Sequence, residues 1–133
     1  MLLSIGAVIG GFLVTVILVS VSTVFACVIC GVKQKSNPSE TVPANYLAAN
    51  LTLSLLSAIV GGYVCGWIAH SDPLVHAGIL AGLLGVLSLT TAVATGAAPG
   101  QPTWYPWVIG VIGVSGILVG GYVRLLTNSN PAG

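Results

Sequence analysis

The chain has 133 residues, of which 56% are hydrophobic and only 4% are charged, and its mean hydropathy is +1.07. A soluble domain carries about 25% charged residues, so this composition excludes a water-soluble fold and predicts an integral membrane protein. The formal net charge of +1 also lacks the basic surface that nucleic-acid binding requires, and we expect no nucleic-acid partner.

Four apolar stretches reach the length of about 20 residues that a helix needs to cross the hydrocarbon core. They comprise residues 2–31, 46–69, 74–95 and 104–126. None shows the alternation over about 10 residues that is typical of membrane strands. Because lipid offers no partner for free backbone groups, we predict an all-α bundle of four transmembrane helices in a single domain, residues 1–133.

The first stretch is expected to remain as a helix, because its start, MLLSIG, lacks the basic residues of a signal peptide. It ends in a CxxC motif, Cys27 and Cys30. Such a motif can be redox-active or half of a zinc site, but Cys65 is the only further cysteine. Cysteines three positions apart share one helix face, so packing as small apolar residues is the favoured interpretation.

The polar segment KQKSNPSETVPAN that follows is predicted to be a loop. Its Lys33 and Lys35 outnumber Arg124 on the other side of the membrane. The excess of basic residues in cytoplasmic loops therefore favours this loop in the cytoplasm, with both termini outside.

The second stretch carries a stripe of small and polar residues: Asn50, Ser54, Ser57 and Gly61. Steps of four, three and four place them on one helix face, which we expect to look into the bundle. The stripe either joins helices through hydrogen bonds or lines a narrow path for a solute. The first interpretation is favoured.

The turn HSDP and the start of the third stretch bring together His70, Asp72 and His76. The three could form a metal site, a proton relay or a pigment ligand, although polar residues are expected in a turn at the membrane surface. His76 is the histidine that lies within a span, and small neighbours (Ala77, Gly78 and Ala81) would clear space for a flat ring. If the chain contacts a haem or pigment, we expect His76 to bind it. A contact with lipid, pigment or haem is compatible with the sequence, which requires no cofactor and no metal.

The pentapeptide VGGYV occurs at 60–64 and again at 119–123. Small residues allow close helix contact in lipid, so we interpret both copies as packing motifs; duplication of a two-helix unit is the alternative, but the halves match poorly elsewhere. The glycines that we predict to pack helices are Gly61, Gly62, Gly66, Gly78, Gly82, Gly116, Gly120 and Gly121.

Four aromatic residues near predicted helix ends are Trp67, Trp104, Tyr105 and Trp107. Amphipathic rings prefer the membrane–water interface, and we expect all four to lie there as anchors.

The spans carry no charged residue at their centres, whereas ion and proton transport usually needs one. No nucleophile has a plausible base beside it, so we expect no enzyme activity. The sequence favours a non-catalytic accessory or structural subunit of a larger membrane complex, such as a respiratory or photosynthetic one. It would sit in the bacterial inner membrane, with lipid and other subunits as its partners. The alternative is a small channel or transporter that uses the Asn50 to Gly61 face.

The motifs GGYVCGWIA, DPLVHAGILAGLLG, PTWYPW and GGYVR together resemble small, uncharacterised four-span membrane proteins of bacteria. The resemblance covers residues 58–124 and implies the four-span topology. Its motifs concern packing and the membrane interface, so it implies no activity.

Overall fold

The computed structural model describes residues 2–31, 41–70 and 72–129. The predicted all-α class is confirmed, with helices α1 (Leu2–Ile29), α2 (Ala44–Ala69), α3 (Pro73–Thr95) and α4 (Tyr105–Ser129). The ends of these helices differ from the predicted ones by at most three residues. All four are long and apolar enough to cross a membrane, and the chain is a multi-pass integral membrane protein.

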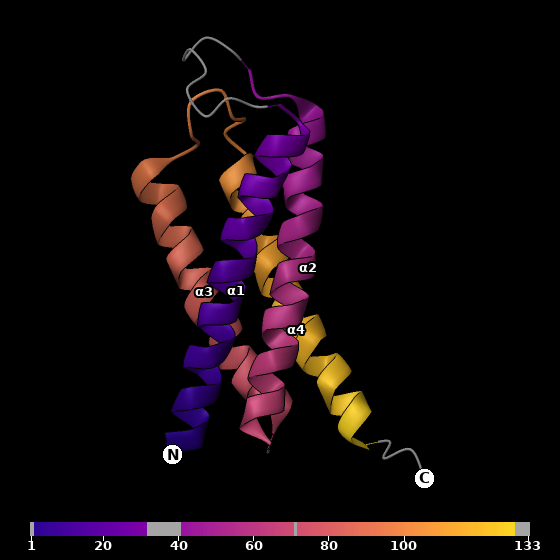
Figure 1. Ribbon diagram of the computed structural model, residues 1–133. Coiled ribbons are helices and arrows are strands. Elements are labelled where there is room, and N and C mark those ends of the chain that lie inside the picture. The colour runs from indigo at the N-terminus through magenta and orange to yellow at the C-terminus, as the bar shows by residue number, and fades with distance from the viewer. Residues whose placement is uncertain (1, 32–40, 71, 130–133) are drawn as a thin grey trace.

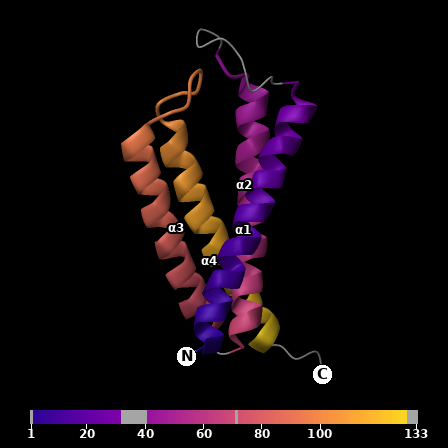
Figure 2. The same cartoon turned by 60° about the vertical axis from the view of Figure 1, so that its left-hand side comes forward.

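The helices run alternately up and down, so that α1 begins and α4 ends beside the short turn between α2 and α3 (Figure 1). The main contacts follow the order α1, α2, α4, α3. The α1–α2 and α3–α4 pairs converge toward the end with the two termini and diverge toward the other end (Figure 2). At the divergent end, the backbone N–H of Val42 donates to the carbonyl of Gly100 over 2.9 Å and links the two loops.

The backbone of α2 touches that of α4, which runs in the same direction (Figure 1). A Cβ added to Gly62 would collide with the carbonyl oxygen of Ile117, and a Cβ added to Gly120 would collide with that of Ile59. The two contacts are reciprocal, because each glycine meets the residue three positions before the other. No residue larger than glycine fits at either position without moving a helix.

One turn earlier, the same crossing continues with Gly116. A Cβ there would lie 2.7 Å from the Cβ of Ala58 and 3.0 Å from the carbonyl oxygen of Leu55. Ala58 precedes Gly62 by four residues, just as Gly116 precedes Gly120. The crossing therefore pairs two small-xxx-small motifs, an arrangement that lets helices gain van der Waals contact in lipid.

The other glycine of each VGGYV copy serves a different neighbour. A Cβ on Gly61 would collide with the Thr15 side chain of α1, and one on Gly121 with the Ala77 side chain of α3. Successive residues of a helix point about 100° apart, so a glycine pair offers a flat surface to two neighbours. The two copies thus occupy both inner helices of the packing order, α2 and α4.

Gly78 and Gly82 differ from the other predicted packing glycines. A Cβ on either would meet no described atom within 4 Å, so these two glycines do not hold the four helices together. The inner face of α3 consists instead of Ala77, Leu80 and Ala81, which are at most 3% exposed. The glycine pair lies off that face and is turned outward.

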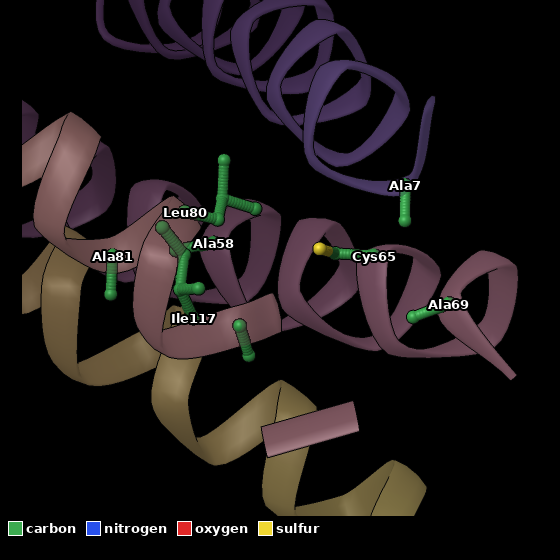
Figure 3. Packing of buried hydrophobic residues seen from close by; sticks show 8 residues of the cluster. Ala7, Ala58, Cys65, Ala69, Leu80, Ala81 and Ile117 are labelled. Carbon is green, nitrogen blue, oxygen red and sulfur yellow. The ribbon is translucent and has the colours of Figure 1, made fainter. Parts of the chain in front are cut away.

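Small side chains dominate the core at the convergent end. Leu80 and Ile117 are 0% exposed and are the largest members of a cluster that Figure 3 shows between the helices. The other members are Ala7, Ala58, Cys65, Ala69, Ala77 and Ala81. Large apolar side chains point outward instead, for example Val28 at 74% exposure and Val111 at 67%. That distribution suits a protein whose surroundings are as apolar as its core.

We predict that Gly62→Leu lowers the free energy of unfolding by about 3 kcal/mol or more, because the leucine would force apart two backbones in contact. Gly113→Leu is the matched control, since a Cβ at Gly113 meets no described atom within 4 Å, and should change stability by less than about 0.5 kcal/mol. Thermal or denaturant unfolding in detergent measures both. Equal effects of the two variants would contradict the crossing.

Candidate functional site: a buried polar seam between α1, α2 and α4

The stripe on α2 faces the interior. Asn50, Ser54 and Ser57 are 5%, 4% and 5% exposed, and Gly61 lies against Thr15 of α1. Their polar side chains, with the side chains that meet them from α1 and α4, form the buried polar seam. An unpaired polar group in an apolar interior costs free energy, so the bonds of the seam determine what it can do.

Asn50 joins three helices. Its Nδ2 donates to the hydroxyl oxygen of Tyr105 on α4 over 2.6 Å. Its Oδ1 lies 3.2 Å from the Thr23 hydroxyl oxygen of α1, which shares its one proton between this amide oxygen and the Val19 carbonyl at 2.9 Å. The amide thus connects α1 and α4 at the end where the two helix pairs diverge (Figure 2), and a side chain as long as tyrosine bridges that distance.

Tyr105 therefore corrects one prediction. We expected this residue to be an interface anchor, but only 4% of it is exposed. Its hydroxyl is drawn inward by the Asn50 amide, whereas its neighbours Trp104 and Trp107 are 50% and 49% exposed. Trp67, at the opposite end of the bundle, is 58% exposed. The three tryptophans thus point outward from the two ends, as an interface position requires.

A second pair of hydroxyls lies deeper in the seam. Ser57 donates to the carbonyl of Leu53 over 2.8 Å, which uses its only proton. Ser22 of α1, with its oxygen 3.2 Å from that of Ser57, must therefore donate across the helix contact. Ser54 differs, because its buried hydroxyl has no hydrogen-bond partner among the described residues.

The α1 half of the seam was missed by sequence reasoning. Thr15, Ser22 and Thr23 all contact the α2 stripe. Together with Ala7, Gly11 and Ala26, which are buried, they form a small and polar face along α1. Apart from Thr23, these residues are spaced by four and seven, which is typical of one helix face and could have revealed it.

The two cysteines of the CxxC motif are free thiols. Cys27 contacts the Tyr46 hydroxyl, with its sulfur 3.6 Å from the oxygen. Both cysteines pack against a second cluster at the divergent end, which consists of Ala26, Tyr46, Leu47 and Tyr105. In this structure the thiols act as half-buried packing groups.

His76 is buried, with 8% of its surface exposed. Its Nδ1 lies 3.0 Å from the Asp72 carbonyl oxygen, and because a carbonyl only accepts, Nδ1 carries the proton. The expected space for a flat ring is filled on one side, because Ala77 and Ala81 are 0% and 3% exposed and Ala77 packs against Gly121.

His70 points elsewhere, since it is exposed and its Nδ1 lies 3.0 Å from the carbonyl of Ile68. Within residues 2–31, 41–70 and 72–129, no three His, Cys, Asp or Glu side chains gather closely enough to hold a metal ion. The structure therefore does not unite His70, Asp72 and His76 into one site.

No protein-family model, curated protein or solved structure matches the chain. The structure supports the resemblance to small four-span membrane proteins at the level of topology, through its four long apolar helices.

We predict that Tyr105→Phe lowers the free energy of unfolding by about 1 kcal/mol, the range of interhelical hydrogen bonds in membranes, because it removes the acceptor of the Asn50 amide. Tyr122→Phe is the matched control: Tyr122 is 52% exposed, and loss of its hydroxyl should leave stability nearly unchanged. A double-mutant cycle with Asn50→Ala measures the coupling. Additive effects of Tyr105→Phe and Asn50→Ala would show that the bond contributes nothing.

Proposed function

We propose that the protein is a non-catalytic structural subunit of a larger complex in the bacterial inner membrane, and that α3 is the helix that packs against another subunit. The observation that carries this proposal is the glycine pair Gly78 and Gly82. Neither residue has a side chain, and no described atom of the chain lies within 4 Å of the position that a Cβ would take.

The glycine pair lies beside a row of large side chains on the outer surface of α3. Gly82 is exposed, and the residues that flank the glycines are large and outward: Val75, Ile79, Leu83 and Val86 are 59%, 53%, 48% and 67% exposed. Glycines four residues apart beside a ridge of large side chains allow a second backbone to approach closely. The same spacing occurs at Gly116 and Gly120 of α4, where the backbone of α2 packs against the glycines.

The seam supports a structural role over a catalytic or transport role. Its amide and most of its hydroxyls bond to each other or to backbone carbonyls, which leaves few groups to bind a solute. The alternative, a narrow channel along Asn50, Ser54, Ser57 and Gly61, would have to break these bonds and open the contact between Gly61 and Thr15.

The proposal is tested on the chain extracted in mild detergent from the membranes in which it naturally resides. We expect the wild-type chain to migrate in a particle larger than its detergent-bound monomer. In the double variant Gly78→Ile with Gly82→Ile, the ratio of particle to monomer should fall at least about tenfold, which corresponds to about 1.4 kcal/mol. The reason is that the isoleucines fill the space beside the glycines. The thermal stability of this variant should stay unchanged, since no described atom lies in the filled space.

Gly113→Ile is the matched control, because Gly113 also has nothing within 4 Å but lies on α4. It should leave the particle intact. A wild-type chain that migrates as a monomer, or a double variant that keeps the particle, would contradict the proposal. Solute flux into liposomes that Ser57→Leu abolishes would support the channel instead.

A further inference from the structure

Arg124 stands apart from the other residues of the spans. It lies near the end of α4, and in the described part of the chain the only other Asp, Glu, Lys or Arg is Asp72, in the turn before α3. A guanidinium stays charged at any pH that a membrane protein meets. A cation near the end of an otherwise apolar helix reaches toward the membrane interface, where an anion or backbone carbonyls can pair with it.

The arginine stem is held by α2. A Cβ added to Gly66 would lie 3.2 Å from the Cγ of Arg124 and 3.4 Å from its Cβ, so the glycine makes room for the stem. The Cζ atom lies 5.9 Å from the centroid of the Tyr63 ring, within the range of a cation–π contact. Gly66 and Tyr63 together place the guanidinium at the convergent end of the bundle.

These contacts position the guanidinium and leave its hydrogen-bonding capacity unused. The Nε atom is buried and has no hydrogen-bond partner among the described residues, and a ring face accepts no hydrogen bond of ordinary strength. Guanidinium donors form a planar fork that matches the oxygens of a phosphate. The unbonded fork suits an anion with paired oxygens, which would approach its terminal nitrogens because the Nε itself is buried.

The surroundings indicate where that anion comes from. Trp67, next to Gly66 in the chain, is 58% exposed, and Tyr122, two residues before Arg124, is 52% exposed. Such amphipathic rings lie at headgroup depth, where lipid phosphates are the abundant anions. The Tyr63 face that could have attracted a choline or ammonium group already faces the guanidinium, which disfavours zwitterionic headgroups.

We infer that Arg124, held by Tyr63 and Gly66, forms a binding site for the phosphate of an anionic phospholipid. The inference is independent of the proposed subunit role, because this site lies on α2 and α4, whereas that role rests on Gly78 and Gly82 of α3. Lipid phosphate and free phosphate share the same chemistry, and the experiment separates them.

The test measures the thermal stability of the purified chain in an uncharged detergent doped with phosphatidylglycerol, with phosphatidylcholine, or with inorganic phosphate. Phosphatidylglycerol should raise the melting temperature at concentrations about fivefold lower than phosphatidylcholine, as expected for one basic residue near anionic lipid. Arg124→Gln should abolish that difference. Asp72→Asn, which removes the described carboxylate at the same end, should keep it.

Tyr63→Leu keeps the charge of Arg124 but removes the ring that positions it. This variant should reduce the preference for phosphatidylglycerol over phosphatidylcholine about twofold to threefold. It also keeps the inference testable if Arg124→Gln fails to fold. Equal shifts with both lipids, or a preference that survives in Arg124→Gln or Tyr63→Leu at full strength, would overturn the site. A shift that inorganic phosphate reproduces in full would overturn the lipid as its ligand.

Discussion

Contact between the backbones of α2 and α4 is the constraint on which the bundle depends. In lipid, helices gain little from burying apolar surface, because the surrounding hydrocarbon is equally apolar. Association then requires close packing, which improves steeply as the helix axes approach. Gly62 and Gly120 bring the two backbones into contact, with each hydrogen in place of a Cβ facing a carbonyl oxygen of the other helix.

The double glycines extend this contact to the remaining helices. Since neighbouring residues point about 100° apart, Gly61 can face α1 while its neighbour faces α4, and Gly121 can face α3 while its neighbour faces α2. The two copies of VGGYV thereby join four helices in the order α1, α2, α4, α3. A repeated motif can arise in this way from two helices with the same packing task.

Stability is distributed differently at the two ends of the bundle. At the convergent end, small side chains such as Ala58, Ala77 and Ala81 fill the core. At the divergent end, polar side chains bridge longer distances, as Asn50 and Tyr105 do over 2.6 Å between their polar atoms. Directional bonds can specify the register of helices that do not interlock tightly. The seam is thus understandable as a structural element, and the outer face of α3 is the surface that we propose for a partner.

Composition and periodicity determined much of this protein before its fold was known. The scarcity of charged residues indicated a lipid environment, and the lengths of the apolar runs indicated four helices to within three residues at each end. The period of the α2 stripe indicated its inward face. Each of these properties belongs to one helix or to the chain as a whole. They follow from local chemistry, so a sequence can display them without information about neighbours.

Tertiary structure decided which small and aromatic residues meet. Gly62 and Gly82 belong to the same type of motif, yet only the first has a helix against it, and Tyr105 turns inward while Trp104 turns outward. The reason is that both faces of a membrane helix are apolar, so hydrophobicity does not distinguish the packed face from the lipid face. That distinction depends on the crossing and register of helices far apart in sequence, which the backbone contact between α2 and α4 sets.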